Sequence, residues 1–150
     1  MKNNSLAMGK DKLRKFAENL TFKCMVQPEF DDIFHKDHPL KGNWHKEFFH
    51  NDNPIVLELG CGRGEYTVAL AERNPDKNYI GIDIKGARMW RGAKTATERN
   101  MANVGFVRTR IEFIQSFFAE GKAMGKVDNQ AAFVPMTVHG DVVEVQVRTH

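Results

Sequence analysis

This 150-residue sequence is poor in the features that mark secreted and membrane proteins. It contains only two cysteines, Cys24 and Cys61. Two cysteines are too few for a disulfide framework, and the count suits a reducing compartment. No stretch approaches the roughly 20 apolar residues that a helix needs to cross a bilayer. No charged segment followed by an apolar one opens the chain. We therefore expect a cytoplasmic protein without membrane segments.

The sequence also lacks a strong excess of charge of either sign, because 22 basic and 19 acidic residues leave a net charge of only +3. Basic residues do gather near the beginning, between Lys2 and Lys23. Such a segment attracts phosphate backbones, although a solvated surface has the same composition. With 41% hydrophobic residues, the chain can bury the modest core of a single domain.

Residues 55–64, with the sequence IVLELGCGRG, form the most informative stretch. Four of the first five residues are apolar, and glycines then alternate at Gly60, Gly62 and Gly64. This pattern predicts a buried strand that enters a tight turn, with a helix over about 65–73 after it. Because glycine has no Cβ, a ligand can approach the backbone closely there. Strand, glycine turn and helix together present backbone N–H groups at the carboxyl edge of a sheet.

A second short apolar run, residues 78–83, ends in an acid one crossover later. Asp83 at the tip of this strand is well placed to accept hydrogen bonds from both hydroxyls of a ribose. A nicotinamide-binding motif would need glycine at position 65, which is Glu65 here, so that function is disfavoured. The glycine spacing after Glu58 instead resembles the first motif of class I S-adenosylmethionine-dependent methyltransferases.

Strands and helices alternate regularly after Pro54. The order β-α-β-α-β-α predicts a parallel sheet with right-handed crossovers. Before this region we expect a short basic helix over 11–20 and an irregular segment over 25–53. The expected strands are 55–59, 79–83 and 104–108, and the expected helices are about 65–73, 86–99 and 111–120.

The sequence changes character after Glu120. Residues 121–125 predict a loop, and two apolar runs, 131–138 and 142–147, follow it around a turn. Valine alternates with polar residues in the second run, which indicates one buried and one solvated face. That alternation is typical of an antiparallel or edge strand. We therefore expect residues 123–150 to contain a β-hairpin at the edge of the sheet.

Three segments, 53–67, 81–94 and 103–104, together resemble the bacterial tRNA (guanine-N7-)-methyltransferases. The likeness covers roughly residues 8–122. It implies an α/β fold, specifically a partial Rossmann-like class I methyltransferase fold whose parallel sheet has flanking helices. The resemblance implies three parts. A basic amino-terminal arm with an irregular segment spans 1–53, the cofactor-binding half of a methyltransferase domain spans 54–122, and a divergent tail spans 123–150.

The resemblance implies methyl transfer from S-adenosylmethionine to N7 of a guanine in tRNA. The cofactor and tRNA would then be the partners, and no metal ion is implied. The family has an acid just after the third strand, where this chain has Arg110, with Glu112 two residues on. By matched position the resemblance assigns the cofactor contacts to Glu58, Gly60, Cys61, Gly62, Asp83, Ile84, Arg110 and Ile111.

No catalytic residue is assigned. The family continues into Phe-Pro-Asp-Pro, whose Asp is its expected catalytic residue, and then into a run of Lys and Arg. At the matching spacing this chain has Pro135 followed by Met136, without the basic run. We therefore expect a truncated or frame-disrupted relative. The alternative to an enzyme is a non-catalytic S-adenosylmethionine- or RNA-binding remnant. Uncovered sheet or helix faces would favour a homodimer.

Several other residues invite a functional interpretation. Four histidines between residues 35 and 50 match no closed zinc pattern, so we interpret them as polar loop residues. Cys61 has no base nearby in sequence and is expected to pack beneath the cofactor. Trp90, with Arg88 and Arg91, would either stack on adenine or contact RNA phosphate. The alternative is that Trp90 is an ordinary half-buried residue. Apolar residues at helical spacing predict core packing for Phe113, Ile114, Phe117 and Phe118.

Overall fold

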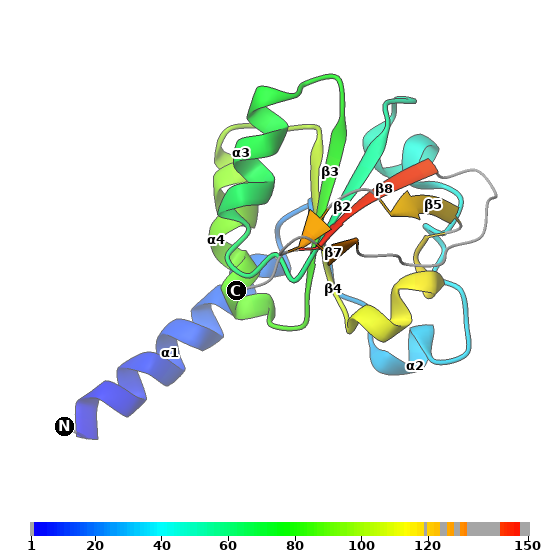
Figure 1. Ribbon diagram of the computed structural model, residues 1–150. Helices are drawn as coiled ribbons and strands as arrows, with labels where there is room; N and C mark the ends of the chain where they lie inside the picture. Colours follow the sequence, from blue (N-terminus) through cyan, green and yellow to red (C-terminus); the bar gives the residue numbers. More distant parts are fainter. Residues whose placement is uncertain (1, 119, 124–125, 128–129, 132–141, 148–150) are drawn as a thin grey trace.

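The computed structural model describes residues 2–118, 120–123, 126–127, 130–131 and 142–147. Six strands form one sheet in the order β1-β4-β3-β2-β8-β5, and every neighbouring pair is parallel (Figure 1). The strands of this sheet are β1 (Met25–Val26), β2 (Ile55–Leu59), β3 (Asn78–Asp83), β4 (Val104–Arg108), β5 (Glu120–Ala123) and β8 (Val142–Val147). A separate antiparallel pair joins β6 (Lys126–Val127) and β7 (Gln130–Ala131).

Helices cover both sides of this sheet. The chain steps outward from β2 through β3 to β4 and then crosses to the other side of β2, as in a doubly wound fold. The predicted partial Rossmann-like arrangement, a parallel sheet with flanking helices, is therefore confirmed. The helices are α1 (Lys2–Asn19), α2 (Phe30–Ile33), α3 (Glu65–Arg73) and α4 (Gly86–Glu98), with a π-helical turn η1 (Trp44–Phe49) and a 3-10 helix η2 (Ile111–Ser116).

Each face of the sheet has its own apolar core. The residues of β2 alternate between the two cores, because successive side chains of a strand point to opposite faces. On the face covered by α3 and α4 (Figure 1), the core includes Val56, Val68, Ala71, Met89, Ala93 and Phe106. On the other face, η1 and η2 contribute to a core that includes Trp44, Ile55, Leu57, Ile114, Phe117 and Phe118.

Close backbone packing fixes α4 against the turn after β2. A Cβ on Gly64 would lie 2.5 Å from the Phe106 ring, and one on Gly92 would lie 2.9 Å from the Arg63 carbonyl oxygen. The Gly92 N–H donates to that oxygen at 2.8 Å. Glycine at both positions therefore allows helix and turn to approach within hydrogen-bond distance.

The predicted hairpin at the sheet edge is wrong for residues 142–147. Strand β8 lies between β2 and β5 and runs parallel to both. Alternation of apolar and polar residues reports the burial of one face, but it does not report the direction or number of neighbouring strands. The first run of the expected hairpin, together with Met136, lies mostly in residues 132–141, outside the described part of the chain.

The predicted helix over 111–120 is also wrong. Residues 111–116 form the 3-10 helix η2, and 120–123 form β5, where a loop was expected. Isoleucine and phenylalanine dominate this segment and have modest helix propensity, so packing on the sheet determines its path. The core prediction is confirmed, because Ile114, Phe117 and Phe118 are buried and Phe113 packs against them.

The amino-terminal region is more regular than predicted. Helix α1 begins at Lys2, nine residues before the expected start, and ends at Asn19. The expected irregular segment, 25–53, contains β1, α2 and η1. Among the described residues, no helix is both long and apolar enough to cross a membrane.

Candidate functional site

A pocket of about 370 Å³ opens at the carboxyl ends of β2, β3 and β4. Ligands of parallel α/β sheets bind at this edge, beside the strand where the winding reverses, which is β2 here. Residues that directly follow the three strands form the wall. The lining residues are Gly60, Asp83, Ile84, Thr109, Arg110, Ile111 and Glu112.

The glycine turn after β2 has a backbone that only glycine adopts readily. Gly60, Gly62 and Gly64 have φ angles of 73°, 57° and 75°, in the left-handed region. The Gly60 and Cys61 N–H groups both donate to the Ile82 carbonyl oxygen, at 2.8 and 3.0 Å. The turn is thereby folded back over the end of β3 and brought next to Asp83.

Asp83 joins the glycine turn to the start of α4. Its Oδ2 accepts a hydrogen bond from the Gly62 N–H at 2.9 Å, and its Oδ1 accepts one from the Lys85 N–H at 3.1 Å. The side chain is half-buried and lines the pocket. Because each carboxylate oxygen has two acceptor positions, Asp83 keeps acceptor capacity for a hydroxyl-bearing ligand.

Two of the predicted cofactor residues are buried and do not line the pocket. Glu58 is 2% exposed and accepts a hydrogen bond from the Thr67 hydroxyl at 2.7 Å. Cys61 is 3% exposed. Burial raises the pKa of the Cys61 thiol, and the Glu58 and Asp83 carboxylates raise it further. A neutral, buried thiol is a packing group rather than a nucleophile.

Thr109 and Glu112 line the pocket, but the sequence interpretation did not assign them to the site. Thr109 is 6% exposed, and its Oγ1 has no hydrogen-bond partner among the described residues. Glu112 lies on the same wall as Arg110. The position of Thr109 in the sequence could have indicated that it belongs to the site. It directly follows β4, just as Gly60 and Asp83 stand at the ends of β2 and β3.

The structure thus gathers most of the predicted residues around one pocket. Gly62 joins the pocket group through its hydrogen bond to Asp83. Glu58 and Cys61 are buried and are not part of the pocket wall. The predicted residues that line the pocket directly are Gly60, Asp83, Ile84, Arg110 and Ile111.

The other candidate residues lie elsewhere. His38 accepts a hydrogen bond from the Leu40 N–H, and His45 is bonded to the Asn53 carbonyl oxygen. Within the described part of the chain, no group of three or more His, Cys, Asp or Glu side chains could hold a metal ion. Trp90 of α4 is 8% exposed and packs against Arg14 and Lys15 of α1. It does not line the pocket.

Comparison with known proteins decides the family. A family described as "Putative methyltransferase" matches residues 52–127, which is half of the chain and includes every residue that lines the pocket. This chain belongs to that methyltransferase family. The matched segment runs from the residues before β2 to the end of β6, so it includes the glycine turn and Asp83.

Curated relatives of this methyltransferase chain are named tRNA (guanine-N(7)-)-methyltransferase. The one from Christiangramia forsetii is 60% identical over 110 residues, which are 73% of this chain and 49% of the relative. The one from Bacteroides fragilis is 56% identical over 115 residues, 77% of this chain and 46% of the relative. The one from Porphyromonas gingivalis is 68% identical over 84 residues, which are 56% of this chain and 34% of the relative. The chain spans about half the length of these relatives, or less.

Proposed function

We propose that the pocket at the ends of β2, β3 and β4 binds S-adenosylmethionine, and that the chain transfers its methyl group to N7 of a guanine in tRNA. The observation that carries the proposal is the Asp83 carboxylate. It faces the pocket from the end of β3 and is held by the backbone of the glycine turn. The names of the curated relatives support the choice of tRNA as acceptor.

The chemistry of the pocket wall fits an adenosyl group. Asp83 offers acceptor positions for the ribose hydroxyls. Ile84 and Ile111 are 46% and 44% exposed and offer apolar surface to a purine ring. The unpartnered Thr109 hydroxyl can hydrogen-bond a ring nitrogen or amino group. Of the other residues that the sequence assigns to the cofactor, Gly60 and Arg110 line the pocket and Gly62 is bonded to Asp83. Glu58 and Cys61 are buried and would support the glycine turn rather than contact the ligand.

The chain's own contribution to the reaction is positional. The bound cofactor supplies an electrophilic methyl group, and guanine N7 already carries a lone pair, so no strong base is required. The pocket wall must therefore hold the two reactants in line and keep water out, and such alignment lowers the barrier by removing the entropy cost of encounter. Hydrogen bonds from the Gly62 and Lys85 N–H groups keep the Asp83 carboxylate fixed in this geometry.

A second candidate function is cofactor binding without catalysis. Met136 stands where the family motif has its expected catalytic Asp, and a thioether cannot balance positive charge that develops on the guanine. A chain of this kind would bind S-adenosylmethionine or RNA without transferring the methyl group.

One experiment separates the two functions. The purified chain is incubated with unmodified tRNA and S-adenosylmethionine carrying a radiolabelled methyl group, and label in the tRNA is measured over time. Mapping of N7-methylguanosine in the product identifies the modified atom. Label at guanine N7 supports the enzyme. Binding of the cofactor by a folded chain without any incorporation supports the non-catalytic alternative, and label on another atom contradicts the proposed acceptor.

A further inference from the structure

Positive charge is concentrated on α1 and α4. Residues 9–19 and 86–98 together contain seven cationic and three anionic side chains, a net charge of +4. The rest of the sequence contains 15 cationic and 16 anionic side chains, a net charge of −1. The modest net charge of the whole chain therefore conceals a basic pair of helices. The cations of residues 9–19 and 86–98 are Lys10, Lys12, Arg14, Lys15, Arg88, Arg91 and Lys94.

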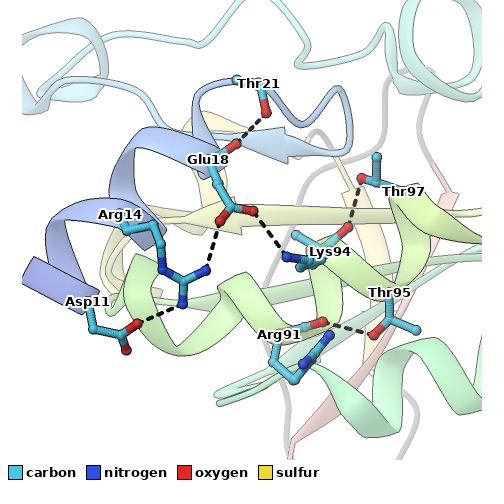
Figure 2. Close-up of polar contacts among 9 residues, drawn as sticks. Asp11, Arg14, Glu18, Thr21, Arg91, Lys94, Thr95 and Thr97 are labelled. Atoms are coloured by element: carbon cyan, nitrogen blue, oxygen red, sulfur yellow. Dashed lines mark hydrogen bonds and ion pairs between the residues drawn. The ribbon is translucent and has the colours of Figure 1, made fainter.

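The two helices form one continuous surface, because the carboxyl-terminal half of α1 packs on α4. The Asn19 side-chain amide donates to the Gly86 carbonyl oxygen at 2.9 Å, and this contact is buried. Lys94 of α4 forms an ion pair with Glu18 of α1 at 3.4 Å (Figure 2). The amino-terminal part of α1 projects away from the body of the molecule (Figure 1).

Trp90 fixes four of these cations in place. The cationic groups of Arg14, Lys15, Arg91 and Lys94 lie 5.0 to 5.2 Å from the centroid of the Trp90 ring. Cation–π attraction of this kind holds flexible basic side chains at defined positions. Basic side chains that are already ordered lose less conformational entropy when they bind an anion.

The cationic groups around the Trp90 ring outnumber the carboxylates that pair with them. Arg14 pairs with Asp11 and Glu18, while Lys15 pairs with Asp11 (Figure 2 shows the Arg14 contacts). The hydrogen bond from Arg14 holds the pKa of the Asp11 carboxyl below its usual value, so Asp11 stays ionised. Two carboxylates face four cations, which leaves an excess of two positive charges around the ring.

The basic surface reaches the rim of the proposed cofactor pocket. Arg88, in the first turn of α4, has a guanidinium nitrogen 3.5 Å from the position that a Cβ on Gly62 would take. Arg88 is exposed, and Gly62 is bonded to Asp83 of the pocket wall. Cations thus extend from α1 along α4 to the glycine turn.

We propose that the α1/α4 basic surface binds the phosphate backbone of RNA and guides it toward the pocket. This inference rests on the proposed function, since it supplies the binding surface for the RNA substrate. An RNA backbone matches the surface because its charges are closely spaced along a strand and complement a row of ordered cations. The contacts are to phosphates, so the surface carries little sequence preference.

The test measures binding of unmodified tRNA to the full chain by fluorescence anisotropy at several salt concentrations. The double variant Lys15→Gln/Arg91→Gln removes two cations from the Trp90 cluster, and Lys36→Gln/Lys46→Gln removes two exposed cations outside it. The affinity of the first variant should fall about tenfold or more, and its slope of log K against log salt should decrease by about 1 to 2. The matched control should retain affinity and slope.

A second double variant tests the surface without disturbing the packing around Trp90, so that a loss of tRNA binding does not simply reflect a folding defect. Lys10→Gln/Lys12→Gln changes exposed side chains on the same surface that do not contact Trp90, and it should also weaken tRNA binding. Equal affinity and equal salt slope for all variants would overturn the inference, as would equally tight binding of polyglutamate in competition. Binding of S-adenosylhomocysteine separates this inference from the proposed function. If the unmodified chain and the variants all bind S-adenosylhomocysteine and all bind tRNA equally tightly, only the RNA surface is wrong. If the folded, unmodified chain does not bind S-adenosylhomocysteine, the proposed function is wrong instead.

Discussion

At the scale of single residues, the pocket depends on side chains and backbone groups that directly follow parallel strands. Gly60 and Gly62 follow β2, Asp83 ends β3, and Thr109 follows β4. Parallel strands place their carboxyl ends at one edge, so positions that are distant in sequence meet there. Asp83 both orders the glycine turn and faces the pocket. A substitution at this residue therefore tests ligand binding and local order together.

Thr109→Val should affect stability and ligand binding in opposite directions. Valine has the shape of threonine without its hydroxyl, and the Thr109 Oγ1 is buried without a partner. Removing an unsatisfied buried hydroxyl should raise the free energy of unfolding by up to about 1 kcal/mol. If the hydroxyl serves the ligand, affinity for S-adenosylhomocysteine should fall roughly threefold to tenfold. Urea unfolding and calorimetry measure the two effects.

Thr67→Val is the matched control for that prediction. Thr67 is also buried, but its hydroxyl donates to Glu58 at 2.7 Å. The substitution leaves a buried carboxylate without that donor, so the free energy of unfolding should fall by about 1 to 3 kcal/mol. Equal loss of stability in Thr109→Val and Thr67→Val would contradict the assignment of an unpartnered hydroxyl at Thr109.

Gly92→Ala should destabilise the protein even though it improves helix propensity. Alanine is favoured over glycine inside a helix by about 1 kcal/mol, but the new Cβ would lie 2.7 Å from the Phe106 ring and 2.9 Å from the Arg63 carbonyl oxygen. Overpacking of this kind costs about 1 to 3 kcal/mol. In urea unfolding the Gly92 variant should lose stability. Gly9→Ala, where nothing lies within 4 Å, should be neutral or stabilising.

At the scale of elements, the sequence predicts well wherever a strand or helix has a strong local pattern. Strands β2 and β4 and helix α3 have the predicted bounds. Five of the eight predicted cofactor residues lie on one pocket wall, because the glycine turn and strand-end acid specify their own geometry. Strand β8 and helix η2 were misjudged because their neighbours, which are distant in sequence, determine their direction and their form. Thr109 was missed because its burial depends on tertiary packing.

Trp44 of η1 packs on the residues that directly follow η2. The Trp44 Nε1 donates to the Phe117 carbonyl oxygen at 2.7 Å, and the Trp44 ring stacks on Phe118 with centroids 5.0 Å apart. Trp44→Phe leaves that buried carbonyl without its donor and should lower the free energy of unfolding by about 1 to 3 kcal/mol.

Trp90→Phe is the control for the Trp44 variant. The Trp90 Nε1 is buried without a hydrogen-bond partner among the described residues, so this substitution removes ring area but no hydrogen bond. Urea unfolding should show a smaller loss of stability for Trp90→Phe than for Trp44→Phe. The reverse order would indicate that cation–π contacts to Trp90 outweigh the bond that holds η1 to η2.

At the scale of the whole molecule, the proposed cofactor pocket and the proposed RNA-binding surface meet at the glycine turn. The pocket wall follows the three strand ends, while the cations of α1 and α4 approach the turn at Arg88. Methyl transfer requires the methyl donor and its acceptor at one place, and the two proposed sites would bring them together. Both proposals therefore depend first on whether the pocket holds the adenosyl group.

Calorimetric titration of the purified, folded chain with S-adenosylhomocysteine tests that claim most directly. The account predicts saturable binding at one site that Asp83→Asn weakens by about 1 to 3 kcal/mol, roughly fivefold to 150-fold, because the amide carries no charge and pairs poorly with two ribose hydroxyls. Asp76→Asn, an exposed acid in the turn before β3, should bind as tightly as the unmodified chain. Absence of binding by the folded chain, or equal affinity in the Asp83 and Asp76 variants, would contradict the account.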